Sequence, residues 1–97
     1  MAIQSFRDQA TEDFFYDGIL PSKGCGWARI KSIVARKLDM IEAANALQDL
    51  RIPPSNRLEK LRGDLEDYYS IRINNQWRIV FRWTDQGPEE VGIIDYH

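Results

Sequence analysis

The feature that most constrains the fold is a run of apolar residues that alternate with polar ones through residues 69–83. A period of two is typical of strands that bury one face. A loop of three residues, 74–76, pairs Ile71 with Ile79. A turn one residue shorter would set Ile71 opposite Arg78 and mix the two faces of the sheet. We therefore predict a hairpin with the longer loop, in which asparagine supplies the left-handed conformation.

A further strand is predicted over residues 91–96, after the turn residues 85–88. Aligning Ile93 with Phe81 keeps the apolar face continuous. This register brings three polar side chains into one row on the sheet face away from the helices: Arg72, Arg78 and Tyr96. A second row beside it is expected to hold Ser70, Val80 and Ile94.

Helical patterns come before the sheet. Asp8 is a suitable N-cap for a helix that runs to about Tyr16 and stops at Gly18. Residues 22–26 are expected to form a loop. A longer helix is predicted from an apolar stripe at intervals of three or four residues: Trp27, Ile30, Val34, Leu38 and Ile41. Pro53-Pro54 prevents this helix from extending further. Its charged residues are expected to face water, namely Arg29, Lys31, Arg36, Lys37, Asp39 and Glu42.

The composition fits one compact domain, residues 1–97, with 43% apolar residues and a net charge of −2. Residues 51–82 hold seven basic and four acidic side chains, which favours a local anion-binding surface. Cys25 is the only cysteine, and no apolar run is long enough for a signal or membrane segment. These features predict a protein of the reducing cytoplasm.

An arginine pair beside a tyrosine and the only histidine, His97, suits a phosphodiester. Guanidinium groups bind phosphate oxygens and stabilise charge on phosphorus, while histidine or a carboxylate can transfer protons. RNA supplies its own nucleophile, the 2′-hydroxyl, so no metal or cofactor is expected, and the chain offers few typical metal ligands. The same residues also fit a solvated strand face and a frayed terminus. Alone, they indicate an anion-binding α+β domain.

Residues 53–63, the motif Ser-Ile-Arg-Ile-Asn-x-Gln-Trp-Arg at 70–78 and the terminal Asp95-Tyr96-His97 occur together in this chain. In this combination they resemble the HigB-type "plasmid maintenance killer" toxins of the RelE/ParE superfamily. The resemblance covers nearly the whole chain, including residues 3–6 and the long helix.

This resemblance implies a RelE-like α+β fold, with an N-terminal strand (residues 2–6) and two helices packed on one face of a small, mainly antiparallel β-sheet. It implies the toxin of a type II toxin–antitoxin system, which inhibits translation by cleaving messenger RNA on the ribosome through the RNA 2′-hydroxyl. It also implies a cognate helix-turn-helix antitoxin as a partner. The toxin would reach operator DNA only through that antitoxin, and no membrane partner is expected.

Site residues follow from the same resemblance. Arg78 would contact the scissile phosphate. Tyr96 and His97 would orient the RNA or transfer protons, with Asp95 as their polar partner. Glu59 falls where some members carry histidine, and it replaces that base only if its surroundings raise its pKa. Further cations are expected to bind the substrate: Arg57, Lys60, Arg62 and Arg72. Arg62 falls where relatives use lysine, and either cation binds phosphate.

Two other functions stay open at this point. A gyrase-poisoning toxin on the same fold would not require the phosphate-binding residues. An antitoxin-binding and operator-regulating module with weak or absent nuclease activity would fit Glu59 and the acidic net charge.

Overall fold

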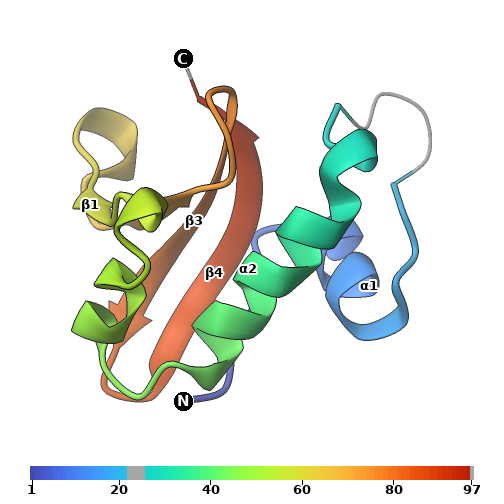
Figure 1. Cartoon of the computed structure of the whole chain (residues 1–97). Helices are drawn as coiled ribbons and strands as arrows, with labels where there is room; N and C mark the ends of the chain where they lie inside the picture. The colour runs from blue at the N-terminus through green and yellow to red at the C-terminus, as the bar shows by residue number, and fades with distance from the viewer. Residues whose placement is uncertain (22–25, 97) are drawn as a thin grey trace.

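The first helix, α1 (Gln9–Asp17), begins and ends where the sequence predicts (Figure 1). The structure is a computed structural model that describes residues 1–21 and 26–96. The Asp8 side chain accepts a hydrogen bond from the Thr11 backbone N–H at 2.7 Å. Gly18 ends the helix at φ 70°, a conformation that glycine adopts without steric cost. Of the predicted loop at 22–26, only Gly26 lies within the described residues.

The second helix, α2 (Lys31–Ala43), carries three residues of the predicted stripe, whereas Ile30 lies in the preceding 3₁₀ turn at Ala28–Ile30 and Trp27 lies just before that turn. Val34, Leu38 and Ile41 are fully buried. Lys37 contradicts the expectation of a water-facing charge, because it is only 4% exposed. Its ammonium group donates a hydrogen bond to Oδ1 of the buried Asn56. Helical periodicity alone cannot predict that the later segment containing Asn56 packs against α2.

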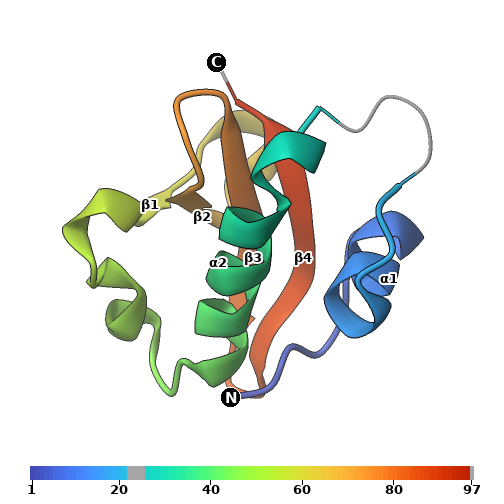
Figure 2. The same cartoon turned by 45° about the vertical axis from the view of Figure 1, so that its right-hand side comes forward.

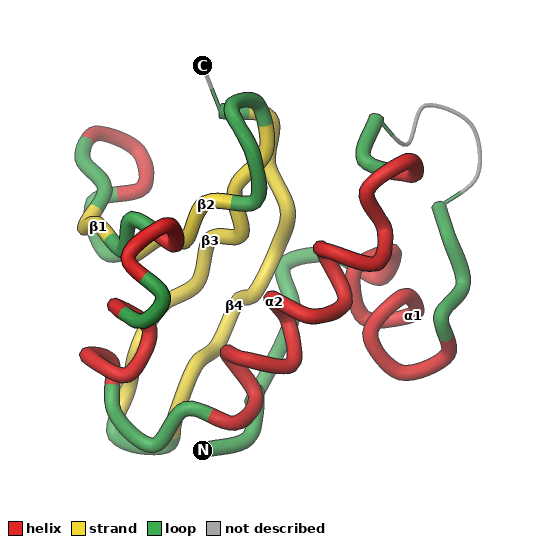
Figure 3. Tube along the Cα trace, viewed as in Figure 1, coloured by secondary structure: helices red, strands yellow, loops and turns green. Residues whose placement is uncertain are grey.

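Short 3₁₀ helices connect α2 to the sheet and interrupt it, as the coloured tube in Figure 3 shows. They are η2 (Leu47–Arg51), η3 (Pro54–Asn56) and η4 (Gly63–Leu65). Asn56, at the end of η3, is fully buried and donates to the carbonyl oxygen of Leu50 at 3.1 Å. This contact ties η3 to η2 at the side of the sheet.

The sheet of the described residues has four strands in the order β1-β2-β3-β4, and every neighbouring pair is antiparallel. The strands are β1 (Glu59–Lys60), β2 (Tyr69–Arg72), β3 (Trp77–Thr84) and β4 (Gly87–Asp95). β1 lies before the alternating run at residues 69–83, so the period-two pattern did not predict it. It is an edge strand of two residues.

The predicted register of the hairpin between β2 and β3 is confirmed, but the left-handed asparagine expected in its loop is wrong, because Arg57 and Glu90 are the only described residues other than glycine with a positive φ. Ile71 pairs with Ile79 and Arg72 with Arg78, as the three-residue loop requires. Asn74 shapes that loop, since its side-chain oxygen accepts hydrogen bonds from the backbone N–H groups of residues 76 and 77, at 2.9 and 2.8 Å. An asparagine that bonds to the backbone in this way mimics a turn.

The predicted pairing of Tyr96 with Arg78 is wrong, because Ile94 lies opposite Arg78. Every partner in this part of β4 is likewise shifted by two residues. β4 already begins at Gly87, and the ladder then shifts at Glu90, whose φ is 54°. Such a bulge places two residues opposite one and changes the register beyond it. The second row accordingly consists of Ser70, Val80 and Gly92.

The predicted N-terminal strand is reduced to a single parallel bridge between Phe6 and Val91. The segment does run along β4, since the Gln4 N–H donates to the carbonyl oxygen of Pro88 at 2.8 Å and the Arg7 N–H to that of Val91 at 2.9 Å. The irregular backbone of β4 at its bulge accounts for the missing regular ladder.

Figure 2 shows α2 lying across the sheet, with α1 beside it near β4. The core joins the α2 stripe to one face of the sheet, which bears Ile71, Ile79 and Phe81. Because side chains alternate along a strand, the other face bears Ser70, Arg72 and Arg78. None of the helices in the described ranges is long and apolar enough to cross a membrane.

Candidate active site

Arg78 is a charged group whose side chain is only 8% exposed. Its Nε donates to Ser70 Oγ at 2.7 Å, and its Nη2 donates to the backbone carbonyl oxygen of Arg57 at 2.6 Å. Burial lowers the pKa of Arg78, and the neighbouring Glu59 carboxylate acts in the opposite direction. Because a guanidinium keeps its proton in proteins, Arg78 is a fixed, buried cation.

Glu59 and Tyr96 lie around this cation. Glu59 Oε1 is 3.7 Å from Arg78 Nη2 and accepts a hydrogen bond from the Tyr96 hydroxyl at 3.3 Å. The centre of the Tyr96 ring is 5.2 Å from Arg78 Cζ, within the range of a cation–π interaction. Glu59 and Tyr96 are 45% and 40% exposed, so a ligand can reach them. We call Glu59, Ser70, Arg78 and Tyr96 the Arg78 cluster.

One end of the Arg78 guanidinium is still available. Its Nη1 group makes no hydrogen bond with any residue that the structure describes, whereas Nε and Nη2 are both occupied. No buried side-chain nitrogen or oxygen in the described part of the chain lacks a partner, so Nη1 is not completely enclosed. A guanidinium that described residues hold at two positions and not at the third is prepared for an anion.

The sheet brings the cluster together from separate segments. Glu59 pairs with Ser70 across β1 and β2, so their side chains share a face. Arg78 comes from β3 and reaches over β2 to Ser70 and Glu59. Tyr96 follows the end of β4, where its backbone N–H donates to the carbonyl oxygen of Gln76 at 2.6 Å.

The predicted substrate-binding cations lie at different distances from this cluster. Arg72 is opposite Arg78 and donates to Asn75 Oδ1. Arg57 contributes its carbonyl oxygen, with a left-handed backbone at φ 46°, while the residue itself is exposed. Lys60 and Arg62 are exposed, and the structure gives neither of them a contact with Arg78.

Asp95 lies beside the cluster at the end of β4. It is opposite Trp77, and its Oδ2 accepts a hydrogen bond from Gln76 Nε2 at 3.0 Å. His97 lies outside the described residues. Of the five residues predicted for catalysis, the structure thus gathers Glu59, Arg78 and Tyr96 into mutual contact.

Three features of the site were not among those predicted from the sequence. Ser70 fixes Arg78, and a serine beside an arginine row could have signalled this. The Arg57 carbonyl leaves no signal in the side-chain pattern. The third is the buried pair of Lys37 and Asn56. Asn56 is the residue that precedes Arg57 in the chain. Burial, together with the charges of Arg36 and Arg72, lowers the pKa of Lys37.

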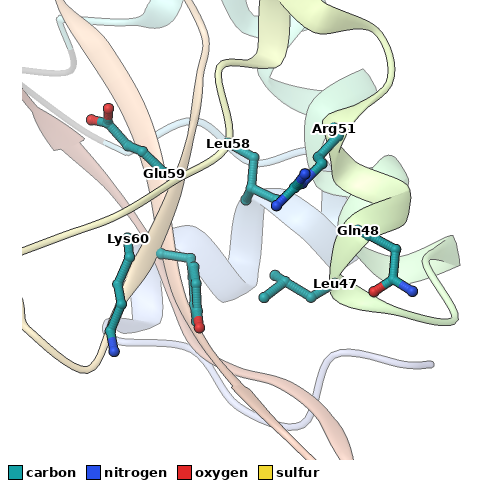
Figure 4. Close-up of a pocket in the computed structure, with 7 residues that line it drawn as sticks. Leu47, Gln48, Arg51, Leu58, Glu59 and Lys60 are labelled. Carbon is teal, nitrogen blue, oxygen red and sulfur yellow. The ribbon is translucent and has the colours of Figure 1, made fainter.

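A pocket of about 240 Å³ lies on the other side of β1, between that strand and η2. Figure 4 shows Arg51 and Leu58 among the side chains around this space, with the Glu59 carboxylate pointing away from it. We call it the η2/β1 pocket. It is lined by Leu47, Gln48, Arg51, Leu58, Glu59, Lys60 and Tyr69. Glu59 is therefore shared between the pocket and the Arg78 cluster.

The family of the chain follows from its sequence. A family model described as the RelE-like toxin of type II toxin–antitoxin system HigB matches residues 4–97. The toxin HigB-1 of Vibrio cholerae is 42% identical over 89 residues, which cover 88% of this chain and 86% of the relative. The chain belongs to the HigB-like toxin family. The resemblance seen in the sequence motifs is thereby confirmed.

Proteins of lower identity match this HigB-like toxin over nearly its whole length. The endoribonuclease HigB of Proteus vulgaris is 28% identical over 95 residues, which cover 98% of this chain and 99% of the relative. Among solved structures, the YoeB–YefM complex of Staphylococcus aureus matches with a TM-score of 0.56 at 23% identity, covering 100% of this chain and 97% of the other. The YoeB/ParE toxin of Agrobacterium tumefaciens matches with a TM-score of 0.54 at 20% identity over both full chains. These likenesses confirm the RelE-like α+β fold.

Within residues 1–21 and 26–96, no three histidine, cysteine, aspartate or glutamate side chains are grouped so that they could hold a metal ion. What the Arg78 cluster offers is a buried cation, an accessible carboxylate and a phenol within hydrogen-bonding reach of that carboxylate. Such a set can bind a phosphate group and move a proton beside it.

Proposed function

We propose that this protein is an endoribonuclease that cleaves messenger RNA on the ribosome and so inhibits translation. The observation that carries the proposal is the contact of buried Arg78 with the accessible Glu59 carboxylate and the Tyr96 ring. Membership of the HigB-like toxin family supports it, as does the name of the Proteus vulgaris relative, an endoribonuclease.

Arg78 would bind the scissile phosphate through its Nη1 group. Charge builds on the phosphate oxygens as the nucleophile attacks, and a fixed cation at that place stabilises the transition state. Ser70 and the Arg57 carbonyl hold the guanidinium, so it need not reorganise during the reaction. Burial strengthens the interaction, since less water screens it.

The remaining residues would transfer protons and orient the RNA. Glu59 would take the proton of the 2′-hydroxyl, whose oxygen attacks phosphorus and forms a 2′,3′-cyclic phosphate. The bond from phosphorus to the 5′-oxygen breaks, and that oxygen must receive a proton. We assign this second step to His97 or Tyr96, with Asp95 as a polar partner that orients the terminus. This mechanism uses no metal ion or cofactor.

Arg57, Lys60, Arg62 and Arg72 would bind the RNA backbone on either side of the reacting phosphate. Arg72 is directly opposite Arg78 and fits a neighbouring phosphate. Exposed lysine and arginine side chains supply the attraction that brings a polyanion to a protein whose net charge is −2.

The proposed partners are a helix-turn-helix antitoxin and the messenger on the ribosome, with operator DNA reached only through the antitoxin. The family description places such toxins in type II toxin–antitoxin systems, which supports the first of these. The solved relative from Staphylococcus aureus is a complex named YoeB–YefM. A cytoplasmic location follows from a ribosomal substrate.

Mapping transcript ends after induction of the protein without its antitoxin tests this function. New 5′ ends within coding regions are expected with the wild type and absent with Arg78→Ala. Growth arrest with intact transcripts and inhibited gyrase would favour the gyrase-poisoning alternative. Intact transcripts without growth arrest would leave the antitoxin-binding module.

A further inference from the structure

We propose that the η2/β1 pocket binds one base of the RNA, that of a nucleotide next to the scissile phosphate. This inference rests on the proposed endoribonuclease function, because it places the reacting phosphate at Arg78. The pocket would then hold the RNA through a nucleotide that takes no part in the bond-making step.

The walls of the pocket suit a flat, mainly apolar group. Leu47, Leu58 and Tyr69 are half-buried and line it. One face of the Tyr69 ring is stacked on Phe81, with the ring centres 6.4 Å apart, so the ring is held in place. Pockets for drug-sized ligands occupy about 300–1,000 Å³. The space of about 240 Å³ is smaller than this range and suits a single base. Bases stack on fixed aromatic rings such as that of Tyr69.

Three polar side chains that line the pocket are uncommitted, whereas Glu59 contacts Arg78 and Tyr96. Arg51, Lys60 and Gln48 are exposed, and none of them has a hydrogen-bond or ion-pair partner among the described residues. The two cations leave positive charge at the mouth of an apolar pocket, which matches a base followed by its phosphate. The Gln48 amide can donate to and accept from the edge of a base. A purely hydrophobic protein segment would use none of these groups.

The position of the pocket connects it to the Arg78 cluster. β1 is an edge strand of two residues, and Glu59 on this strand lines the pocket while also contacting Arg78. Figure 4 shows Leu58 and Glu59 directed to different sides of the chain. An RNA strand bound at Arg78 can therefore pass over this narrow edge and place its next base between β1 and η2.

The test measures affinity separately from cleavage. Ribosomes are programmed with one defined message that carries a 2′-deoxy nucleotide at the cleaved position, which removes the nucleophile. An abasic nucleotide is then placed at each neighbouring position in turn. We expect one abasic position to weaken wild-type binding about tenfold, the loss typical of one stacked base.

A double variant, Arg51→Gln with Lys60→Gln, should weaken binding of the intact message by at least tenfold and reduce its dependence on salt. The matched control is Arg29→Gln with Lys31→Gln, which removes two exposed cations from the start of α2 and its preceding turn. This control should bind RNA like the wild type.

Equal affinity for the intact message and for every abasic one would overturn the proposal. So would a double variant that binds and cleaves RNA normally but no longer binds the antitoxin, because the pocket would then be a protein-docking site. If the abasic effect is found but the normal message is not cleaved, the proposed function fails while the base-binding pocket stands. If the normal message is cleaved but no abasic position weakens binding, the base-binding pocket fails while the proposed function stands.

Discussion

Arg78 Nη2 lies 3.7 Å from Glu59 Oε1, and the two side chains differ greatly in exposure, at 8% and 45%. The cation is thus fixed in the protein while the carboxylate stands at the surface beside it. A phosphate bound at the Arg78 guanidinium, as proposed, would lie near the Glu59 carboxylate. In the proposed mechanism, this one relationship would put charge stabilisation and a proton acceptor on the same side of a substrate.

The variant Arg78→Ala should lower the cleavage rate by a hundredfold or more, because one well-placed donor to a developing charge contributes about 3 kcal/mol. Rates measured with ribosomes that carry one defined message check this. Thermal unfolding should accompany the assay, since the change leaves Ser70 and the Arg57 carbonyl without their partner.

Arg82→Ala is the matched control on the same strand. Arg82 is exposed, and the one described partner of its guanidinium is Glu89 at 3.8 Å. It should cleave at nearly the wild-type rate. An equal loss in both variants would mean that general charge, rather than the Arg78 site, governs cleavage.

Glu59→Gln should slow cleavage by about a hundredfold, in the range expected when a general base is removed. Glu59→His should restore most of the activity near neutral pH, because imidazole is suited to proton transfer there. The comparison uses single-turnover rates at saturating enzyme. If Glu59→Gln cleaves as fast as the wild type, Glu59 is a structural partner of Arg78 and another group is the base.

The chemistry-bearing residues were easier to predict than their exact arrangement. Alternation fixed the β2–β3 hairpin, because a slip would have buried Arg78 against Ile71. The tight turn that lets β4 begin at Gly87 has no comparable signal, nor has the bulge at Glu90, so Tyr96 was placed in the wrong row. Tyr96 still reaches Arg78, since a long side chain spans the resulting offset.

Other features depend on contacts that no local pattern contains. Lys37 occupies a helical position that reads as exposed, yet a loop folds over it and supplies Asn56. The carbonyl oxygen of Arg57 is a backbone group, and only the path of the chain after η3 directs it toward Arg78. Tertiary structure determines both.

Phe81→Ala should lower the free energy of unfolding by about 3–5 kcal/mol, the usual cost of emptying a buried aromatic site. Phe81 is fully buried between α2 and the sheet. Chemical denaturation measures the change. Ile19→Ala is the control, because Ile19 is 57% exposed and should change stability by no more than about 0.5 kcal/mol. A small loss for Phe81→Ala would contradict the core described here.

Lys37→Met should change the pH dependence of stability. The pKa of Lys37 is lowered from 10.5 in the folded protein, so between the lowered value and 10.5 the unfolded chain binds more protons. Wild-type stability should therefore rise with pH in that window relative to the methionine variant, and the difference should be constant below it. Unfolding of both proteins from pH 7 to 10.5 provides the comparison. A difference that does not depend on pH would mean that burial does not perturb this amine.

The most direct test of the proposed mechanism removes one hydroxyl group from the substrate. Two messages are loaded on ribosomes, one entirely RNA and one with a 2′-deoxy nucleotide at the mapped cleavage position, and single-turnover cleavage by the wild type is measured. We predict cleavage of the first message to a 2′,3′-cyclic phosphate end and none of the second at that position. Cleavage of both messages at the same rate would contradict the central claim that the RNA 2′-hydroxyl is the nucleophile beside Arg78 and Glu59.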